Sequence, residues 1–562
     1  MEYIVFAGVI FAIIVLIMLK GFWDERKKKR AFIQWLREHY GELPKREEYK
    51  EEELKKISRY FRAHEDIGFH IDDITWNDLD MDEVFKRMNY TYSAAGEEYL
   101  YYLLRTPMQD ADKAEILEKH VDYFIRNKEE RIAYQTLFAQ IGKTGKYSIY
   151  DYLDYLDLLG ERNNGIHYLG ILAMVVSLAV MFFSVQYGII LLVVAVSQNI
   201  ISYFKYKNEI DPYIISFGYI LKMIQNVEKM EKLPAGAFAE EMEELKSCRK
   251  KMGQFKAGSY IIMSPSRMNA SGNPLELVMD YIRMIFHLDL IKFNLMLSEV
   301  RKNKESIDKM LTIIGYMEAA IAVGAFRASL ETYCLPRFDR RRGMKAENMY
   351  HPLLEKPVKN SILTEKGVLL TGSNASGKST FLKTVAVNAI LAQTVHTCMA
   401  DSYSAGLYRI MSSMALRDNL SGGDSYYIVE IKSLKRILNQ IEEKGTTVLC
   451  FVDEVLRGTN TVERIAASTQ ILKSLSRANV LCFAATHDIE LTHLLEKYYN
   501  NYHFEEEIID NDVVFHYQLL KGRATTRNAI KLLGVMGYEK EIIREAEKMA
   551  EDFLRSGNWE RG

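Results

Sequence analysis

The first clear pattern along the chain is an uncharged apolar run, residues 3–19, which is followed by Lys20 and by a basic cluster at 26–30. Such a run is long enough to cross the hydrocarbon core of a membrane as one helix. A cleaved secretory signal would carry its positive charges before the apolar run. The pattern therefore predicts a transmembrane anchor over residues 1–23, with the N-terminus outside and the rest of the chain in the cytoplasm.

A second uncharged stretch, residues 168–203, is too long for one span at about 1.5 Å per residue. A break at 184–188 would divide it into a transmembrane helical hairpin with both ends, near Arg162 and Lys205, in the cytoplasm. The alternative is a pair of buried core helices, which the polar residues 197–199 favour because polar groups are costly in lipid. We expect three spans in the cell membrane and a cytoplasmic C-terminal domain.

Amphipathic helical patterns dominate the regions on either side of this hairpin. Apolar positions recur at three- and four-residue spacing in residues 114–124, and the charged run 240–246 is typical of a solvated helix face. We expect a helical lever-like region over residues 24–167 and a helical lever-like or clamp-like region over residues 204–334.

Beyond about residue 335, short apolar runs alternate with helical stretches. The runs at 367–370, 447–452 and 480–485 have the length and composition of buried strands. Their alternation with helices is typical of an α/β domain. The expected fold class is therefore α plus α/β, with a nucleotide-binding domain over residues 335–562.

Composition changes this picture little. The chain has 73 Lys and Arg against 75 Asp and Glu, so no global basic field exists to hold a polyanion, and any nucleic-acid contact needs a local patch. The five cysteines are scattered and include no CxxC pair, which argues against a disulfide framework and against a zinc site. They are typical of reduced cytosolic thiols.

The candidate chemistry begins where the first of these strands ends. Residues 372–379 match GxxxxGK[ST] in full, between a strand that ends at Thr371 and a helix that begins near Lys378. The glycines let backbone N–H groups surround phosphates, and the helix N-terminus adds partial positive charge. We expect ATP here, with Lys378 at the β- and γ-phosphates and the Ser379 hydroxyl on Mg²⁺. The expected nucleotide-binding residues are Gly372, Ser373, Asn374, Ala375, Ser376, Gly377, Lys378, Ser379 and Thr380.

The next two strands also end in polar residues. The run 447–452 leads into Asp453 and Glu454, two carboxylates at the tip of a buried strand. We expect Asp453 to hold Mg²⁺ and Glu454 to orient and deprotonate the attacking water. His487 follows the third strand, where it would sense the γ-phosphate; the alternative is a structural histidine.

A Ser-Gly-Gly turn at residues 421–423 precedes another expected helix, which is a second anion-binding arrangement. One phosphate-binding loop does not need two such sites. We therefore expect this turn to complete the γ-phosphate site of a second subunit. The active unit would then be a homodimer formed through the ATPase domains.

Three of these stretches resemble the MutS family of DNA mismatch-repair ATPases, within the ABC-type ATPases. Residues 371–380 are similar to the family's TGPNMGGKST, and residues 453–461 are similar to its DEIGRGTST. Residues 418–431 follow the family's signature in spacing. Weaker similarity extends to residues 351–353, 522–546 and 88–107, the last of which resembles the start of the family's lever domain.

The resemblance implies Mg²⁺-dependent ATP hydrolysis, with Ser425 reaching the γ-phosphate bound by the other subunit, beside Lys378, Glu454 and His487. It also implies binding of double-stranded, and in particular mismatched, DNA. Two departures bear on this: we expect no mismatch-recognition domain before the lever-like region, and Asp424 stands where the family usually carries a basic residue. Residues 356–358 include no aromatic to stack on adenine, so the choice between adenine and guanine stays open.

The leading hypothesis is a membrane-anchored, MutS-like ATPase that dimerises and moves its lever helices as it binds and hydrolyses ATP. One alternative is a membrane transport or remodelling ATPase, which the similarity of residues 420–423 to the ABC transporter signature favours. Against it, the expected spans carry no intramembrane charge that would mark a substrate path. The other alternative is an ATP-dependent scaffold with no DNA role.

Overall fold

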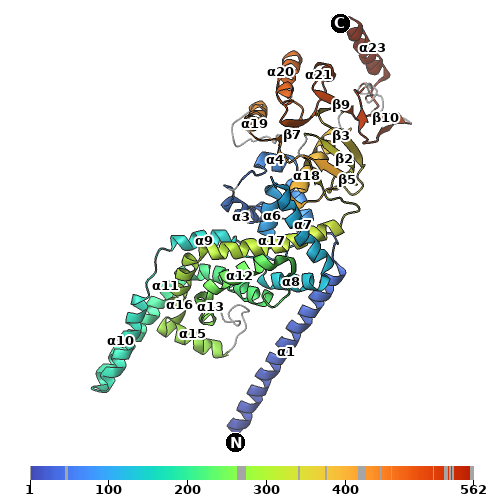
Figure 1. Cartoon of the computed structure of the whole chain (residues 1–562). Coiled ribbons are helices and arrows are strands. Elements are labelled where there is room, and N and C mark those ends of the chain that lie inside the picture. Colours follow the sequence, from blue (N-terminus) through green and yellow to red (C-terminus); the bar gives the residue numbers. More distant parts are fainter. Residues whose placement is uncertain are drawn as a thin grey trace. The chain divides into compact units, whose positions relative to one another are not determined.

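The computed structural model describes residues 2–44, 49–66, 68–262, 274–339, 342–373, 376–414, 426–443, 445–456, 459–509, 512–524, 530, 533 and 537–556. The chain divides into two compact units. Unit 1 comprises Met1–Asp66, Asn89–Tyr102 and Lys119–Ala328, and unit 2 comprises Ile67–Met88, Leu103–Glu118 and Ser329–Gly562. The described part of unit 1 is helical and unit 2 contains the strands, so the predicted mixture of helical and α/β parts is confirmed (Figure 1).

The central helix of unit 1 is α17 (Lys304–Ala328), most of whose side chains are buried. It packs against α8 (Lys128–Ile141), α12 (Ala239–Lys251) and α16 (Leu288–Lys302). The charged run 240–246 lies in α12, as its periodicity predicted. Helices α6 (Ala94–Arg105) and α7 (Ala111–Arg126) contribute residues to both units. The other helices of unit 1 are α1 (Glu2–Glu38), α2 (Glu51–Ile57), α3 (Arg59–Ala63), α9 (Ile149–Leu158), α10 (Gly165–Met181), α11 (Val185–Met230), α13 (Gly253–Lys256) and α15 (Pro274–Phe286), with the 3-10 turns η1 (Gly236–Phe238) and η2 (Ser259–Ile261).

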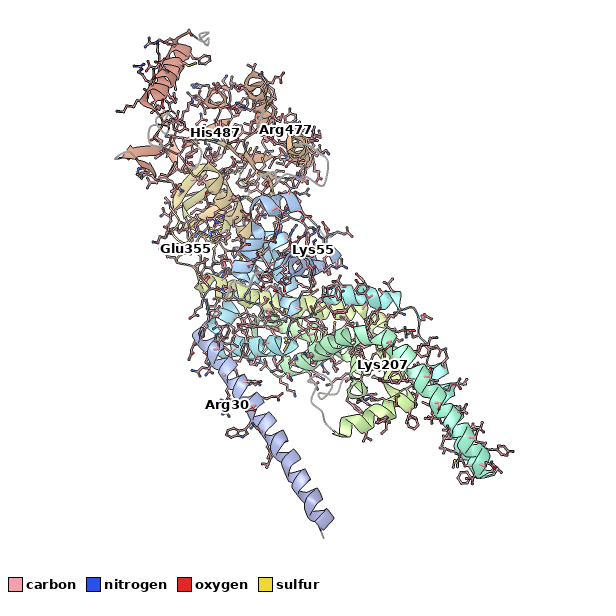
Figure 2. The ribbon with its side chains drawn as sticks, turned by 180° about the vertical axis from the view of Figure 1, so that it is seen from behind. Arg30, Lys55, Lys207, Glu355, Arg477 and His487 are labelled. Carbon is pink, nitrogen blue, oxygen red and sulfur yellow. The ribbon has the colours of Figure 1, made fainter. Side chains whose placement is uncertain are left out.

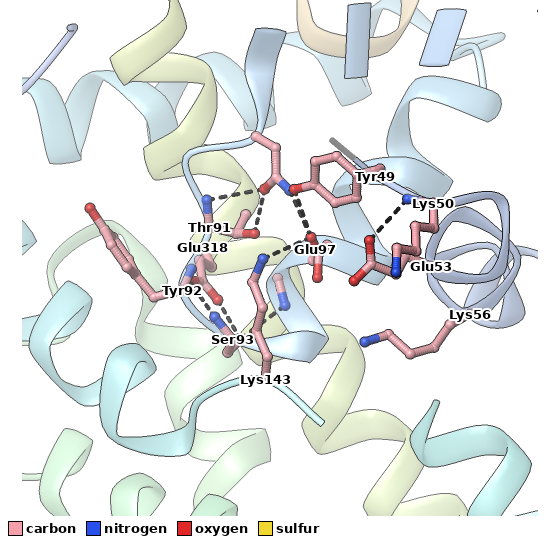
Figure 3. Close-up of polar contacts among 12 residues, drawn as sticks. Tyr49, Lys50, Glu53, Lys56, Thr91, Tyr92, Ser93, Glu97, Lys143 and Glu318 are labelled. Carbon is pink, nitrogen blue, oxygen red and sulfur yellow. Dashed lines mark hydrogen bonds and ion pairs between the residues drawn. The ribbon is translucent and has the colours of Figure 1, made fainter. Parts of the chain in front are cut away.

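A buried carboxylate of α17 holds the start of α6. Glu318 accepts hydrogen bonds from the backbone N–H groups of Tyr92 and Ser93 and from the Ser93 hydroxyl (Figure 3). In α6 itself, the carboxylate of Glu97 accepts a hydrogen bond of 2.9 Å from Lys143. Because Glu318 is almost inaccessible to solvent, burial raises its pKa to about 7. Its contacts fix the N-terminus of α6 against α17.

Helices α10 and α11 form the apolar hairpin that the sequence predicts. The turn between them is Phe182 to Ser184, so α11 begins at Val185, within the segment 184–188 where the break was predicted. Small residues lie in the seam between the two helices, among them Gly170, where an added Cβ would meet the side chain of Asn199. Small residues let two helices approach closely.

Two helices of the described residues are long and apolar enough to cross a membrane, namely residues 185–210 of α11 and the whole of α17. They differ in burial: 83% of the apolar window of α17 lies inside the protein, against 22% of the window of α11. Helix α10 is a shorter apolar helix of 17 residues. We therefore treat α17 as a core helix and distinguish it from the exposed hairpin.

Unit 2 is organised around a six-stranded sheet in the order β12-β9-β4-β8-β7-β6, in which only β12 and β9 are antiparallel neighbours. Strands β4 (Gly367–Thr371), β7 (Val448–Asp453) and β8 (Val480–Ala485) confirm the three predicted strands. The helix predicted after the first strand is α18 (Lys378–Val395). The apolar residues of β7 and β8 form a core with helices α19 (Tyr426–Ile441) and α20 (Thr461–Ser474).

Smaller elements complete unit 2. A four-stranded sheet has the order β1-β5-β2-β3, and β10 and β11 form an antiparallel pair. The remaining elements are α4 (Asp73–Asp78), α5 (Met81–Met88), β1 (Arg337–Phe338), β2 (Met344–Met349), β3 (Asn360–Thr364), β5 (Ser402–Ala405), β6 (Arg409–Ser413), α21 (Ile489–Leu494), β9 (Tyr499–His503), β10 (Glu506–Ile509), β11 (Asp512–Phe515), β12 (Leu520–Lys521) and α23 (Lys540–Ser556).

The short helix α4 covers the edge strand β6. The N–H group of Ser412 donates to the Thr75 hydroxyl at 3.0 Å, and the Asp78 carboxylate accepts from the Ser412 hydroxyl at 2.6 Å and from the N–H group of Met414 at 2.9 Å. An edge strand with unpaired backbone groups is a template for unwanted pairing. The segment 67–88 therefore completes the sheet of unit 2, although it precedes that sheet by more than 250 residues of chain.

Candidate functional site

The predicted site residues follow three adjacent parallel strands. In the order β4-β8-β7, Leu370 of β4 and Asp453 of β7 are both in register with Ala485 of β8. The carboxyl ends of parallel strands meet at one edge of a sheet, where α/β proteins bind ligands. The loop after β4, the two carboxylates after β7 and the histidine after β8 therefore lie at a common edge.

The backbone of the predicted phosphate-binding loop needs glycine at two positions. Gly372 has φ +147° and Gly377 has φ +106°, a region that side chains rarely adopt. A Cβ on Gly372 would lie 2.7 Å from the carbonyl oxygen of Phe504, and one on Gly377 would lie 3.0 Å from Cδ1 of Tyr517. Glycines in such conformations let successive backbone N–H groups turn toward one anion, as a phosphate cradle requires.

Lys378 points back along this loop. Its ammonium group donates to the carbonyl oxygens of Gly372 at 2.9 Å and of Ser373 at 2.7 Å. Burial lowers the pKa of Lys378, and nearby carboxylates oppose that shift. The hydroxyl oxygen of Ser376 is buried without a hydrogen-bond partner among the described residues, so the loop has a donor to offer to a phosphate oxygen.

The two residues predicted to bind the metal lie close together. The hydroxyl of Ser379 is at the first turn of α18, near the carboxylate of Asp453 at the end of β7. Burial raises the pKa of Asp453, and the Ser379 hydroxyl opposes that rise by favouring the charged carboxylate. Hydroxyl and carboxylate oxygens are the hard donors that Mg²⁺ prefers, so this pair fits a magnesium ion.

Glu454, the residue predicted to act on water, and His487, the residue predicted to sense the γ-phosphate, are also in contact. Nε2 of His487 lies 2.8 Å from Oε1 of Glu454. The backbone of Glu454 has φ +56°, which is strained for a residue with a side chain. Next to the histidine, Asp488 accepts two hydrogen bonds from Arg464 of α20, at 2.6 and 3.0 Å. Arg464 thus holds the residue that follows His487.

The other predicted residues add no described contact to the site. Asn374, Ala375 and Ser425 lie outside the described residues, as do the Ser-Gly-Gly turn at 421–423 and Asp424. Thr380 is exposed on the first turn of α18. In the described parts of the chain, no group of three or more His, Cys, Asp or Glu side chains could hold a metal ion by themselves.

Three residues at this edge were missed by the sequence analysis. Glu430 of α19 accepts a hydrogen bond from the backbone N–H group of Leu456, in the strained turn after β7. Glu506 of β10 accepts a hydrogen bond of 2.7 Å from the Ser373 hydroxyl. Tyr517, which follows β11, places its ring against Gly377. No local sequence signal marks the last two, because they approach the loop from more than 120 residues further along the chain.

This chain is similar to known proteins in the region that contains the candidate site. A family model described as MutS domain V matches residues 368–554. The chain is 30% identical to a DNA mismatch repair protein MutS of Thermus thermophilus over 256 residues, which are 44% of this chain and 31% of that protein. It is 30% identical to the DNA mismatch repair protein MutS of Pseudothermotoga lettingae over 228 residues, 39% of this chain and 28% of that protein.

A similar relation holds for a human protein. The chain is 27% identical to the Homo sapiens MutS protein homolog 4 over 298 residues, which are 50% of this chain and 31% of the homolog. The matched region thus spans no more than 31% of the length of any of these three curated relatives. The residues that the family model matches include the candidate site from Gly372 to Tyr517.

Proposed function

Since the chain belongs to the MutS family through its domain V, we propose that it is a MutS-like ATPase that hydrolyses ATP with Mg²⁺, works as a dimer and is anchored in a membrane. The observation that carries the ATPase is the sheet edge at which the Ser379 and Asp453 contact lies beside the Glu454 and His487 contact. A phosphate-binding loop and a pair of carboxylates at adjacent strand ends are what phosphoryl transfer to water requires.

In this proposal the loop residues bind the phosphates and the strand ends supply the chemistry. The N–H groups of residues 372–380 and the ammonium group of Lys378 hold the β- and γ-phosphates. Ser379 and Asp453 hold Mg²⁺, which neutralises charge that develops on the phosphate oxygens. Glu454 orients the attacking water and takes its proton, and His487, which lies 2.8 Å from Glu454, senses the γ-phosphate.

Residues 356–358 include no aromatic to stack on a nucleotide base, but Tyr517 supplies an aromatic ring beside the phosphate-binding loop. It packs against Gly377 at the start of α18, and its own ring stacks on Phe515 with centroids 5.9 Å apart. We assign Tyr517 to contact with the nucleotide base. An aromatic face stacks on either purine, so this assignment leaves the preference between adenine and guanine open.

The proposed dimer is formed through the ATPase domains. Each subunit contributes Ser425, which directly precedes α19 in the chain, to the γ-phosphate bound by its partner, as the family resemblance implies. ATP binding then closes two composite sites at once, and hydrolysis reopens them. We propose that this cycle moves the helices of unit 1, which act as levers.

The membrane part of the proposal is supported by the outer face of the hairpin. At its tip, Phe182 is 91% exposed and Phe183 is 93% exposed. Monomeric soluble proteins rarely expose a contiguous apolar surface of this kind. Helix α10 has 17 residues and is about 26 Å long, close to the ~30 Å of a hydrocarbon core. Further exposed side chains on the hairpin are Leu169, Leu172, Val175, Ile190, Val193 and Val194.

Charged residues flank the apolar segments on the side proposed to be cytoplasmic. At the base of the hairpin, Arg162 pairs with Glu209 at 2.8 Å, and Lys205 and Lys207 lie on α11. Figure 2 shows Lys207 there and Arg30 on α1, within the exposed basic cluster 26–30. This arrangement favours lipid over the alternative of two soluble core helices. The full-length chain should float with liposomes at high salt; recovery at the bottom of the gradient would contradict anchoring.

Binding of mismatched DNA is the part of the proposal that rests on the family alone. Two of the relatives are named DNA mismatch repair proteins. The test is retention of matched and mismatched duplexes by the full-length chain across a salt series, because phosphate contacts weaken steeply with salt. If neither duplex is retained at low salt, the DNA role is wrong and the transport, remodelling or scaffold alternatives take its place.

The ATPase itself is tested by replacing one carboxylate. Glu454→Gln should abolish phosphate release and leave binding of a fluorescent ATP analogue unchanged, because the amide fills the same space without acting as a base. The matched control is Glu442→Gln, an exposed glutamate just after α19. Unchanged turnover in Glu454→Gln would show that the catalytic assignment is wrong, and loss of turnover in both variants would indicate damage to the domain.

A further inference from the structure

Helix α15 (Pro274–Phe286) has exposed apolar side chains on one side and a buried arginine on the other. Val278 is 55% exposed, Tyr281 is 57% exposed, and Phe286 is also exposed. Arg283 is only 2% exposed and pairs with the half-exposed Asp280 at 2.8 Å. At about 100° per residue, the first three lie on one side of the helix and the charged pair lies on the other. A helix on the surface of a soluble protein has the opposite orientation.

Specific contacts with the hairpin fix this orientation. The side-chain amide of Asn199, on α11, donates to the carbonyl oxygen of Ile285 at 3.1 Å. Just after α15, Nε2 of His287 lies 2.8 Å from the carbonyl oxygen of Asn199. These reciprocal bonds tie the C-terminus of α15 to the wall of the hairpin. These bonds also give hydrogen-bond partners within the protein to Asn199, one of the polar residues at 197–199 that would be costly in lipid.

A second set of contacts lies behind the helix. Asp289, at the start of α16, accepts a hydrogen bond from Tyr203 at 2.8 Å and pairs with Lys207 at 3.0 Å. The polar groups of Tyr203, Lys207 and Asp289 are therefore directed toward one another. The surface that α15 leaves outside is apolar, and Figure 1 draws α15 beside α11 and α16, next to the base of the projecting α10.

The contacts also give the depth of α15. Asn199 lies six residues before Lys205, the first charged residue after the apolar part of α11. Six helical residues correspond to about 9 Å. If Lys205 lies among the lipid headgroups, the C-terminus of α15 lies about 9 Å deeper. Helices that lie in the plane of a membrane bury their apolar face about 5–10 Å into the boundary between headgroups and acyl chains.

We propose that α15 is an interfacial helix that lies against the base of the hairpin with Val278, Tyr281 and Phe286 in the lipid. The occupant of its exposed face is the bilayer, at the boundary between headgroups and acyl chains. This inference rests on the proposed membrane anchoring and extends it, because it adds a lipid contact that no apolar run in the sequence predicts. A tyrosine at this depth keeps its hydroxyl near the headgroups while its ring is in the hydrocarbon.

The test measures the depth of single positions in the full-length chain reconstituted in liposomes. Four of the five cysteines are buried, so Cys334→Ser gives a background for labelling. A polarity-sensitive fluorophore is attached through Tyr281→Cys, through Phe183→Cys at the hairpin tip, or through Glu240→Cys on the exposed face of α12. Phospholipids brominated either near the headgroup or near the chain end serve as quenchers.

We expect the Tyr281→Cys label to be quenched several-fold more by bromine near the headgroup than by bromine near the chain end. The Phe183→Cys label should be quenched by at least one of the two brominated lipids, and the Glu240→Cys label by neither. Quenching at Phe183→Cys without quenching at Tyr281→Cys would overturn the proposal for α15 and leave the anchoring intact. Absence of quenching at both positions would mean that the anchoring itself is wrong.

Two further outcomes would assign the exposed face to another occupant. Oxidative crosslinking between two Tyr281→Cys chains in liposomes, with no lipid quenching, would make the face an interface between copies of this chain. Quenching of the Tyr281→Cys label by bromine near the chain end alone would place α15 in the middle of the bilayer. Either result overturns the interfacial position.

Discussion

Replacement of Glu318 by glutamine should remove a pH dependence from the stability of unit 1. The carboxylate lies in the buried helix α17 and accepts hydrogen bonds from the backbone of Tyr92 and Ser93 and from the Ser93 hydroxyl. Burial is the main cause of its raised pKa, and these hydrogen bonds oppose the rise. Glutamine has nearly the same shape and keeps one carbonyl oxygen as an acceptor, but it does not titrate.

The magnitude follows from the pKa. The ordinary value is 4.5 and the value in the folded chain is about 7, so the folded chain binds this proton more tightly than the unfolded chain does. The free energy of unfolding therefore falls as the pH rises from about 4.5 to about 7 and is constant above that range. A shift of this size corresponds to about 3 kcal/mol at most. The stability of Glu318→Gln relative to the natural chain should rise by up to that amount between pH 5 and pH 8.

The assay is denaturant unfolding of the full-length chain in detergent at several pH values, followed by far-ultraviolet circular dichroism. The matched control is Glu305→Gln, an exposed glutamate in the first turn of the same helix, which should leave the pH dependence unchanged. Parallel pH profiles for Glu318→Gln and the natural chain would refute the reasoning. That result would mean that Glu318 is already ionised at pH 5 in the folded chain, held so by its hydrogen bonds.

Three other substitutions have expected outcomes. Gly96→Ala should destabilise the chain by about 1–3 kcal/mol in denaturant unfolding, because the added methyl group would overlap with the carboxylate of Glu318. Gly377→Ala should weaken binding of a fluorescent ATP analogue more than about tenfold while the fold is kept, since φ there is +106°; normal binding would contradict the predicted cradle. Tyr499→Phe removes a buried hydrogen bond of 2.7 Å to the carbonyl oxygen of Leu472, and should cost about 1–2 kcal/mol of stability without changing turnover at 25 °C.

The nucleotide site could be predicted from the sequence to the extent that it follows strand ends. β4, β7 and β8 are short apolar runs, and each leads directly into polar residues. Parallel strands bring such ends to one edge of the sheet, independently of the length and conformation of the loops between them. The contact of Ser379 with Asp453 and the contact of Glu454 with His487 are therefore consistent with what the spacing alone suggested.

Residues that reach the site by tertiary packing could not be predicted in this way. Glu506 and Tyr517 come from β10 and from the segment after β11, and nothing in their neighbourhood distinguishes them from other glutamates and tyrosines. The same holds for α4, whose six residues give too short a periodic pattern to indicate a partner. Its contacts with β6 depend on Thr75 and Asp78, two polar residues that local patterns assign to a surface.

Apolar character alone does not distinguish a helix in lipid from a helix in a protein core. Both α11 and α17 pass the test of length and composition, yet α17 carries Glu318 and is buried by other helices, whereas the hairpin exposes its apolar faces. Helix α15 shows the reverse case, since its sequence includes Asp280 and Arg283 and is too short to span a bilayer. The burial of single charged side chains describes both α17 and α15 better than their apolar content does. In α17 the buried Glu318 has backbone donors of the protein as partners, whereas in α15 the buried Arg283 turns inward and the exposed side chains on the opposite face are apolar.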